Sequence, residues 1–194
     1  MKSIGVFCGS STGLRPVYRE AAQTLGETLA SRDLRLVYGG GNVGLMGIVA
    51  DAALTAGGEV IGVIPDFLIA NEIAHRGLSM LHVVGSMHER KTKMAELSDG
   101  FIALPGGYGT LDEFCEILTW AQLGLHQKPC GLLNVEGYFD PLLKLFDKAV
   151  TEGFLKPTGR SFVLEASDAE DLLDVFATYQ STVVKKSMEQ EVKP

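Results

Sequence analysis

Six short apolar runs, each rich in β-forming residues, recur along the chain and are separated mostly by segments with helical spacing. The runs cover residues 4–8, 34–38, 60–64, 81–84, 101–104 and 131–134. Parallel strands need a long crossover between them, usually a helix, so this alternation predicts a parallel sheet with helices on both faces. Caps and apolar spacing predict helices over residues 17–30, 45–56 and 168–179.

The composition fits one well-buried domain. The chain has 194 residues, of which 46% are apolar, and contains no internal repeat or Pro/Ser-rich linker. We expect a single α/β domain over residues 1–180 and a disordered tail over 181–194, where the sequence is charged and lacks periodicity. The net charge of −7, without a basic stripe, argues against a nucleic-acid polymer as partner. No segment resembles a signal peptide or a membrane span, which predicts a cytoplasmic protein without a membrane partner.

The cysteine and histidine spacings predict no metal site. Cys8, Cys115 and Cys130 are widely spaced in apolar contexts and form no CxxC motif, which favours reduced core residues. The four histidines show neither HExxH nor HxH spacing, and no P-loop pattern is present. We therefore expect chemistry that needs neither a metal nor a cofactor.

Three of the predicted strands end in glycine-rich turns, which begin at Gly9, Gly39 and Pro105. The carboxyl ends of parallel strands share one edge of the sheet, and ligands bind there. The turn after Pro105 reads PGGYGTLDE and leads into a helical pattern. A glycine turn at a helix start presents backbone N–H groups and a partial positive charge, so the amides of Gly106–Thr110 are a candidate phosphate seat.

Glu113 has two interpretations from the sequence. A pure anion site gains nothing from the carboxylates of Asp112 and Glu113 in its first helical turn, which suggests chemistry or hydroxyl binding beside the phosphate. Alternatively, Thr110-x-x-Glu113 is a capping box that only satisfies the helix start.

Arg90 is predicted to point into the protein. The pattern Ser86-x-x-Glu89 is a second capping box, which starts a helix and places Arg90 on an apolar stripe with Met94. A buried guanidinium is costly unless it is paired, so a carboxylate or a bound phosphate should contact it. A purely structural ion pair with Glu113 or Glu72 is the alternative. Lys91 lies at the edge of the stripe, where plain solvation is equally compatible with the pattern.

The pattern Gly39-x-Gly41-x-x-Gly44 resembles a dinucleotide fingerprint, which also needs an acidic residue at the end of the next strand to bind a ribose. Neither candidate fits, because Glu59 precedes that strand and Asp66 lies just after Pro65. The pattern favours a turn that forms one wall of a nucleotide pocket, with Gly41 and Asn42 as binding residues. Tight packing of helix on strand is the alternative.

The pattern Gly9-x-Ser11-x-Gly13 resembles the nucleophile elbow of α/β-hydrolases. In those enzymes the catalytic acid follows the serine in the chain, and the catalytic histidine follows the acid. Here the last histidine is His126, and no histidine occurs in the final third of the sequence, which argues against this assignment. The pattern instead favours Ser10 and Ser11 as hydroxyl donors to a ligand or to the turn.

The helix expected after Pro105 is apolar on more than one side. Its predicted core stripe contains Leu111, Phe114, Leu118 and Leu125, and its remaining surface carries Ile117, Trp120 and Leu123. A single sheet covers one side of a helix, so a second copy of the chain is the simplest cover for the other. The sequence therefore predicts a homodimer.

Three motifs together closely resemble the Lonely guy family of cytokinin-activating phosphoribohydrolases. They are GGGNVGLMG at 39–47, MHERK at 87–91 and PGGYGTLDE at 105–113, and the similarity extends to about residue 179. The resemblance implies a dimeric protein with a modified Rossmann fold. It also implies hydrolysis of the N-glycosidic bond of a nucleoside 5′-monophosphate, giving the free base and ribose 5-phosphate. Family members accept cytokinin riboside monophosphates and often AMP.

The resemblance assigns roles to individual residues. Arg90 and Glu113 resemble the catalytic pair. The positions that resemble substrate-binding residues are Glu72, Lys91, Gly107, Tyr108, Gly109, Thr110, Leu111, Asp112 and Thr119. The turns described above add Ser10, Gly41, Asn42 and Gly106. Two positions depart from the family pattern: Asp112 stands where many relatives have glutamate, and Glu89 where plant relatives often have glutamine.

The expected chemistry agrees with the residues. Breaking a ribosyl C1′–N bond places positive charge on the sugar, which a carboxylate such as that of Glu113 can stabilise while it activates water. Two other functions stay open: a nucleotide or phosphorylated-cofactor carrier of the same fold, and an NAD-dependent oxidoreductase. Some relatives are labelled lysine decarboxylases, which would need pyridoxal phosphate and, in this chain, a hypothetical Schiff base at Lys91.

Overall fold

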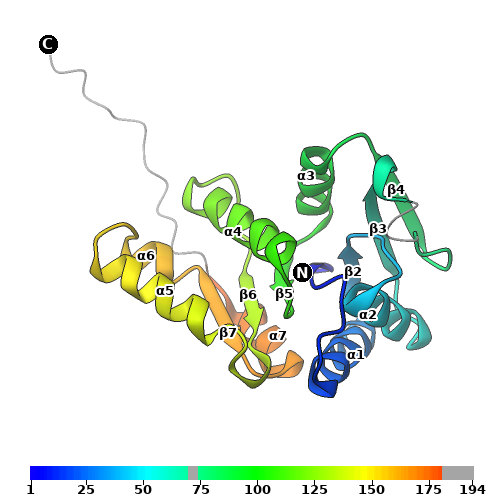
Figure 1. Cartoon of the computed structure of the whole chain (residues 1–194), viewed down its shortest axis with the longest axis horizontal. Coiled ribbons are helices and arrows are strands. Elements are labelled where there is room, and N and C mark those ends of the chain that lie inside the picture. The colour runs from blue at the N-terminus through cyan, green and yellow to red at the C-terminus, as the bar shows by residue number, and fades with distance from the viewer. Residues whose placement is uncertain (70–73, 181–194) are drawn as a thin grey trace, which may run out of the picture.

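Seven parallel strands form one sheet in the part of the chain that the structure describes, residues 1–69 and 74–180 of a computed structural model (Figure 1). The strands are β1 (Ser3–Phe7), β2 (Arg35–Tyr38), β3 (Val60–Pro65), β4 (Met80–Val84), β5 (Gly100–Ala103), β6 (Cys130–Leu133) and β7 (Val163–Ala166). Their order is β4-β3-β2-β1-β5-β6-β7, and every neighbouring pair is parallel. The structure confirms the predicted α/β fold and adds β7 to the six predicted strands.

Helices connect the strands. They are α1 (Pro16–Ser31), α2 (Gly44–Thr55), α3 (Met87–Leu97), α4 (Tyr108–Gln122), α5 (Asp140–Thr151), α6 (Pro157–Arg160) and α7 (Ala169–Thr178), with 3-10 turns η1 (Asp66–Leu68) and η2 (Val135–Gly137). The three predicted helices correspond to α1, α2 and α7. Pro16 occupies the first turn of α1, and Asp168 caps α7 by accepting a hydrogen bond from the Asp171 amide.

Apolar side chains bury both faces of the sheet. On one face, Ile4 and Leu36 pack with Leu25 of α1 and Val49 of α2, and α7 adds Leu172. The second cluster joins side chains of the other face to α3, α4 and α5; its members include Phe7, Val37, Met94, Phe114 and Leu143. Figure 1 shows the same two layers, with α1, α2 and α7 on one side and α3, α4 and α5 on the other. The prediction of helices on both faces is confirmed.

The strand order reverses at β1. From β1 the chain builds outward through β2 and β3 to β4, and then returns to place β5 on the other side of β1. Loops that leave neighbouring strands in opposite directions open a crevice, and this is where ligands bind in such sheets. The turns after β1 and β5 meet here, since the Gly9 amide donates a hydrogen bond of 3.1 Å to the Pro105 carbonyl oxygen.

The buried side of α4 differs from the predicted stripe. Phe114, Ile117 and Ala121 face the core, whereas Leu125 lies beyond the helix end and is 70% exposed. The prediction that Ile117 lies on the outer surface and Leu125 in the core was therefore wrong. The apolar residues of α4 lie on more than one face of the helix. Their spacing alone therefore does not determine which face packs against the sheet.

No helix within the described ranges is both long enough and apolar enough to cross a lipid bilayer.

Candidate functional site

The glycine turn after β5 starts α4 earlier than the sequence pattern predicted. Gly107 is the N-cap, and the helix begins at Tyr108. Thr110 is therefore inside the first turn and Glu113 in the second, so the predicted capping box Thr110-x-x-Glu113 does not exist. The first turn contains no acidic residue, contrary to the prediction for Asp112 and Glu113. Glu113 is thus available for a role other than capping.

The predicted cap of α3 is present, with the return bond from Glu89 shifted by one residue, from Ser86 to Gly85. The Ser86 hydroxyl accepts a hydrogen bond of 3.1 Å from the Glu89 amide, and the Glu89 carboxylate accepts one of 2.7 Å from the Gly85 amide. This fixed helix start orients the next residue, Arg90, whose side chain is 6% exposed. The prediction that Arg90 points inward is confirmed.

Arg90 contacts three separate parts of the chain. Its Nε donates a hydrogen bond of 3.1 Å to the Val63 carbonyl oxygen in β3, and its Nη2 donates one of 3.2 Å to the Gly39 carbonyl oxygen after β2. Its Nη1 lies 3.8 Å from Oε1 of Glu113, whose side chain is 11% exposed. The guanidinium therefore links the ends of two strands to the buried carboxylate on α4. The sequence analysis had named Glu113 and Glu72 as possible ion-pair partners of Arg90, and the structure contains the pair with Glu113.

Gly39 makes this arrangement of Arg90 possible. A Cβ atom added at Gly39 would overlap Nη2 of Arg90 and approach the sulfur of Met46 to 3.2 Å. Any larger residue would displace the guanidinium, because its far end is held by the two backbone carbonyls.

Cys8, at the end of β1, belongs to the same buried region. Burial raises the pKa of its thiol far above the usual range, and the negative charge of Glu113 raises it further, while the positive charge of Arg90 lowers it. A thiol that stays protonated is a poor nucleophile. Cys8 therefore remains a neutral thiol beside the Arg90–Glu113 pair.

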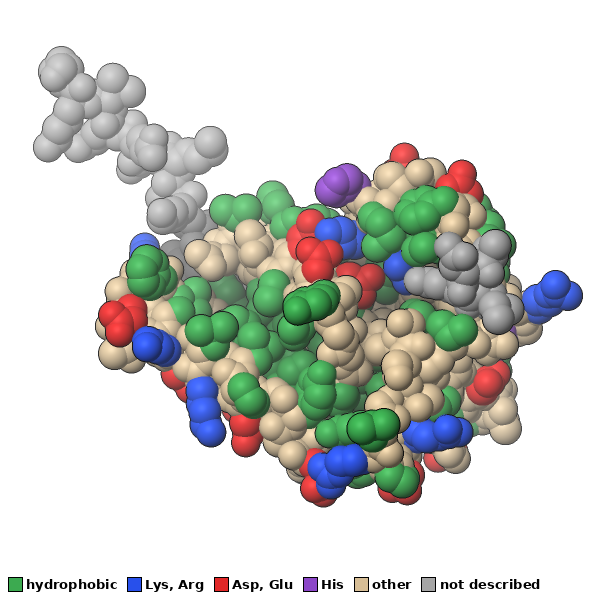
Figure 2. Space-filling model, in the orientation of Figure 1, with side chains coloured by type: hydrophobic (Ala, Val, Ile, Leu, Met, Phe, Trp, Pro, Cys, Tyr) green, Lys and Arg blue, Asp and Glu red, His purple; other side chains and the backbone are tan. Residues whose placement is uncertain are grey.

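Lys91 forms an ion-pair cluster between α3 and α4. Its Nζ lies 2.9 Å from Glu116 and 3.2 Å from Asp112, and its side chain is 10% exposed. Burial opposes the charged form, but the hydrogen bonds to Glu116 and Asp112 outweigh burial and raise the pKa of Lys91. Figure 2 shows basic and acidic side chains side by side between these helices. The sequence had not singled out Glu116, although its i+4 spacing from Asp112 puts both on one side of α4.

The glycine turn is closed on one side and open on the other. A Cβ atom added at Gly106 would overlap the hydroxyl of the buried Thr110 and approach the Gly9 amide nitrogen to 2.9 Å. Gly107 and Gly109 are exposed, and a Cβ atom added at either would meet nothing within 4 Å. The first turn of α4 thus presents open space in front of backbone amides at the reversal of strand order.

The glycines of the Gly39-x-Gly41-x-x-Gly44 pattern pack closely against neighbouring backbone and side chains. A Cβ atom added at Gly44, where φ is +56°, would overlap the Ser10 backbone, so the start of α2 lies directly on the loop after β1. Gly41 is buried and forms an isolated β-bridge with Ala74. Asn42 is exposed, and its side-chain oxygen lies 3.0 Å from where a Cβ of Gly47 would sit. Tight packing explains this motif, and it brings Ser10 to the same edge of the sheet.

The remaining predicted residues lie along α4 or outside the described ranges. Tyr108 is 94% exposed at the start of α4, and Leu111 is partly buried behind it. Thr119 is exposed on the Asp112 side of the helix, two turns further along, and its hydroxyl donates a hydrogen bond of 2.8 Å to the Cys115 carbonyl oxygen. Glu72 lies outside the described residues.

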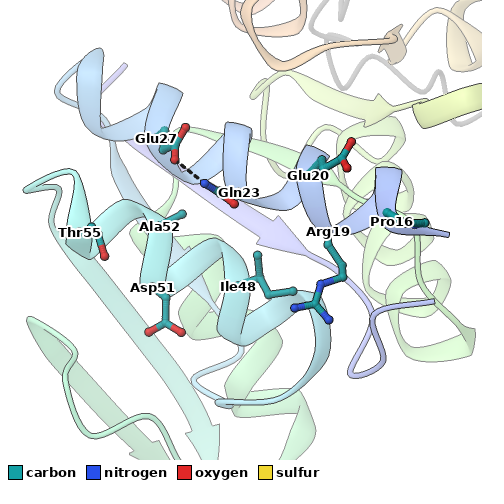
Figure 3. A pocket seen from close by; sticks show the side chains of 9 residues that line it. All are labelled: Pro16, Arg19, Glu20, Gln23, Glu27, Ile48, Asp51, Ala52 and Thr55. Carbon is teal, nitrogen blue, oxygen red and sulfur yellow. Dashed lines mark hydrogen bonds between the residues drawn. The ribbon is translucent and has the colours of Figure 1, made fainter. Parts of the chain in front are cut away.

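A separate groove of about 440 Å³ lies between α1 and α2 (Figure 3). It is lined by Pro16, Arg19, Glu20, Gln23, Glu27, Ile48, Asp51, Ala52 and Thr55. Three of these residues are acidic, which disfavours a phosphorylated ligand. The groove also contains none of the glycine-turn amides, so we place the candidate site at the strand ends instead. Across the described ranges, no three histidine, cysteine or acidic side chains converge in a way that could hold a metal ion.

Known proteins resemble this chain over nearly its whole length. A family model described as possible lysine decarboxylase matches residues 46–176. The cytokinin riboside 5′-monophosphate phosphoribohydrolase LOG1 of Arabidopsis thaliana is 50% identical, over 98% of this chain and 91% of that protein. LOG7 of the same plant, which has the same enzyme name, is 51% identical over 92% of this chain and 82% of that protein.

Solved structures share the fold at lower identity. The molybdenum cofactor binding protein of Rippkaea orientalis has a TM-score of 0.69 and 28% identity, and the match covers 91% of this chain and 95% of that one. The molybdenum cofactor carrier protein of Chlamydomonas reinhardtii has the same TM-score at 24% identity, covering 90% and 95%, which supports the fold alone. About half of the residues are identical to those of LOG1 and LOG7 over most of each chain, so the chain belongs to the Lonely guy family, the family of these phosphoribohydrolases.

Proposed function

We propose that this protein hydrolyses the N-glycosidic bond of nucleoside 5′-monophosphates, including cytokinin riboside monophosphates and AMP, to the free base and ribose 5-phosphate. The observation that carries the proposal is the buried carboxylate of Glu113 one turn beyond an open glycine turn, at the reversal of strand order. The identity of about half the residues to named phosphoribohydrolases supports the same reaction.

The phosphate end of the substrate fits the start of α4. Gly107 and Gly109 leave open space there, and the unpaired amides of a helix start carry a partial positive charge that attracts a phosphate. Glu113 lies about 8 Å further along the helix axis, at 1.5 Å per residue. A ribose can therefore lie between the anion seat and the carboxylate, with its C1′ atom toward Glu113.

The sugar end needs a negative charge. As the C1′–N bond breaks, positive charge develops on the ribose, and the Glu113 carboxylate stabilises it and takes a proton from the attacking water. Arg90 holds this carboxylate from the buried side, since its guanidinium is itself fixed by the Val63 and Gly39 carbonyls. The proton balance is that of hydrolysis: water supplies the hydroxyl to C1′ and the proton to the departing base.

Lys91 supports binding through the second ion-pair cluster. Its contacts with Asp112 and Glu116 hold α3 and α4 together next to the proposed ribose position. The same contacts argue against the lysine decarboxylase label, because an amine that forms a Schiff base needs a lowered pKa, and the pKa of Lys91 is raised.

A carrier without turnover is the second candidate. The 28% identical molybdenum cofactor binding protein, which covers nearly the same length, favours it. Glu113 distinguishes the two candidates, since a carrier of an anionic ligand gains nothing from a buried carboxylate beside the ligand. The NAD-dependent oxidoreductase is less well supported, because a dinucleotide would have to approach the glycines of the fingerprint pattern. The space where a Cβ of Gly39 or Gly44 would lie is occupied by the Arg90 side chain and the Ser10 backbone.

The decisive experiment measures release of ribose 5-phosphate from a panel of nucleoside 5′-monophosphates and the matching nucleosides. The panel contains AMP, isopentenyladenosine 5′-monophosphate, GMP and CMP. We expect turnover of the adenine nucleotides and at least a hundredfold lower kcat/KM for adenosine, because the phosphate contacts are lost. Binding of these nucleotides without any released ribose 5-phosphate would instead establish the carrier.

We further infer a homodimer that acts in the cytoplasm, with its site near the subunit interface. Leu123 and Leu125, at the end of α4, are 69% and 70% exposed, and Leu145 on α5 is also exposed. Figure 2 shows hydrophobic side chains spread over the face formed by these two helices. Such an exposed apolar area favours association. The free thiols of Cys8, Cys115 and Cys130 fit a reducing compartment.

A further inference from the structure

Tyr138 contacts the glycine turn from outside the motifs described above. Its hydroxyl donates a hydrogen bond of 2.6 Å to the Gly106 carbonyl oxygen. Tyr138 follows η2, after β6, so it reaches the turn from a neighbouring strand of the sheet. The contact fixes one peptide group, the one between Gly106 and Gly107.

The orientation of this peptide group decides where the Gly107 N–H points. The described chain contains no cis peptide bonds, and in a trans peptide the carbonyl of one residue and the N–H of the next point in opposite directions. Because the Gly106 carbonyl points at Tyr138, the Gly107 N–H points away from it. Gly107 is exposed, and a Cβ atom added to it would meet nothing within 4 Å, so a phosphate has room to approach this residue.

Other groups hold Gly106 but leave its carbonyl to Tyr138. Thr110 and the Gly9 amide fill the space on the Cα side of Gly106, where they would meet an added Cβ. Glycines on both sides of the bond make the peptide easy to rotate, since neither residue has a Cβ atom to restrict it. A single hydrogen bond to the carbonyl therefore has a large influence on its orientation.

The tyrosine ring is held in place by two aromatic neighbours. Phe139, which is buried, makes an edge contact with it at 5.0 Å between ring centroids, and Tyr18 on α1 makes one at 5.7 Å. Edge-to-face pairs at these distances are favourable. The hydroxyl therefore reaches Gly106 from a ring with a fixed direction.

The backbone before Tyr138 is strained in a way that serves this placement. Glu136 has φ of +51° and Gly137 has φ of +71°, so two consecutive residues adopt the left-handed conformation. A glutamate in this region is unusual and is retained only where the surroundings require it. Arg15 at the start of α1 holds Glu136 through an ion pair of 2.9 Å. This turn brings the tyrosine back toward the glycine loop.

We propose that Tyr138 is a positioning residue for the phosphate, because it orients the Gly106–Gly107 peptide so that the Gly107 N–H faces the bound 5′-phosphate. The proposal rests on the phosphoribohydrolase function, and it concerns the phosphate end of that site alone. A substitution that removes only the Tyr138 hydroxyl should therefore weaken every phosphate-bearing ligand and leave the free base unaffected.

The test compares Tyr138→Phe with Tyr179→Phe. Both remove one hydroxyl and keep the aromatic ring, but only Tyr138 bonds the glycine turn, whereas Tyr179 lies beside Lys2 and Pro129, at the opposite ends of the strands. For Tyr138→Phe we expect the KM for AMP and the Kd of ribose 5-phosphate to rise about two- to tenfold, the range of one lost hydrogen bond, with kcat within about twofold. The Kd of adenine should stay constant, and Tyr179→Phe should match the wild type.

Calorimetry with ribose 5-phosphate separates this proposal from the proposed function, because it needs no turnover. An unchanged Kd of ribose 5-phosphate in Tyr138→Phe would overturn the positioning role even in an active enzyme. An equal loss for ribose 5-phosphate and adenine, together with a lower Tm, would also overturn it, since that pattern indicates general loosening. A wild-type protein that binds ribose 5-phosphate but does not hydrolyse AMP would refute the enzyme function alone.

Discussion

The Arg90 guanidinium lies 3.8 Å from the Glu113 carboxylate, and both side chains are almost completely buried. Arg90 is fixed by the carbonyls of Val63 and Gly39, so the position of the pair is set by the sheet and not only by the two helices that carry it. A buried charge without a partner is costly, which makes each member dependent on the other. The pair therefore links the stability of the fold to the proposed chemistry.

Glu113→Gln should inactivate the enzyme without preventing folding. The change removes the charge that stabilises the sugar cation and activates water, so we expect kcat to fall at least about a hundredfold. No helix cap is lost, because the cap is Gly107. Arg90 keeps its two carbonyl partners, and we expect the unfolding free energy to fall by about 1–3 kcal/mol. Ribose 5-phosphate release and urea unfolding measure the two effects.

Glu96→Gln is the matched control for Glu113→Gln. Glu96 is an exposed carboxylate on α3 that pairs only loosely with Lys93, at 3.4 Å. We expect its kcat and stability to equal those of the wild type. Near wild-type turnover in Glu113→Gln would move the catalytic carboxylate to another residue.

Gly39→Ala should lower activity by displacing Arg90 from the buried side of the site. The new methyl group would displace Nη2 of Arg90, and a shift of about 1 Å at a catalytic group can reduce the rate about a hundredfold. Gly85→Ala is the control, because an added Cβ there meets only the Glu89 side chain, at 3.4 Å. Steady-state assays with AMP compare the two variants. If Gly39→Ala kept full activity, Arg90 would not need its present position.

Arg90→Lys should also be inactive. A lysine ammonium is a point charge and does not reproduce the fork that reaches Val63, Gly39 and Glu113 at once. We expect a loss of about 2–4 kcal/mol in unfolding free energy, because buried carbonyls and a buried carboxylate lose their partner. Arg19→Lys, at an exposed position on α1, should change neither activity nor stability. Wild-type kcat in Arg90→Lys would show that a simple positive charge suffices.

The sequence predicted the layers of the fold well because most strands are buried on both faces. Strands of this kind, which are β1, β2, β3, β5 and β6, are continuous apolar runs. The edge strand β4 is largely exposed and was found because its sequence is also mostly apolar. β7 escaped prediction because it is an edge strand whose Glu165 is exposed. The orientation of Arg90 was predictable from the apolar stripe on its own helix.

The contacts within the site were not predictable from local pattern. Arg90 bonds carbonyl oxygens 27 and 51 residues away, and Tyr138 bonds one 32 residues away. Backbone carbonyls leave no signal in the amino-acid sequence. The capping box at Thr110 was misassigned because a glycine N-cap has no side chain to mark the true helix start, three residues earlier.

Cys130 should make stability depend on alkaline pH. Burial raises the pKa of its thiol from about 9 to about 12. Below the unfolded pKa both states are protonated; above it the unfolded chain loses this proton and the folded chain keeps it, so stability falls as the pH rises from about 9 to 12. The slope is up to about 1.4 kcal/mol per pH unit for one thiol.

Urea unfolding of the wild type and Cys130→Ala at pH 8, 9, 10 and 11 measures this contribution. Other groups titrate in the same range, but the difference between the two proteins isolates Cys130. We expect the wild type to lose stability more steeply than Cys130→Ala above pH 9. Parallel curves would contradict a raised pKa for this thiol.

The exposed end of α4 should form the dimer interface. Trp120 is only partly buried by its own chain, and Leu123 and Leu125 extend the apolar area beyond it. Sedimentation should give a species of twice the 20.8 kDa chain at micromolar concentration. The double variant Leu123→Asp with Leu125→Asp should be monomeric, because two charges would be buried in an interface that needs about 800 Å² per partner.

Phe67→Asp is the control for this interface. Phe67 is 55% exposed on η1, beside β3 and β4 at the opposite edge of the sheet from α5. Phe67→Asp should leave the dimer intact, because Phe67 is an exposed apolar side chain, like Leu123 and Leu125, but lies outside the α4 surface. If the site lies near the interface, the monomeric α4 variant should also lose activity, whereas Phe67→Asp should keep it. Monomers from Phe67→Asp and dimers from the α4 variant would instead place the interface at the β4 edge, and a 20.8 kDa wild type would refute the dimer altogether.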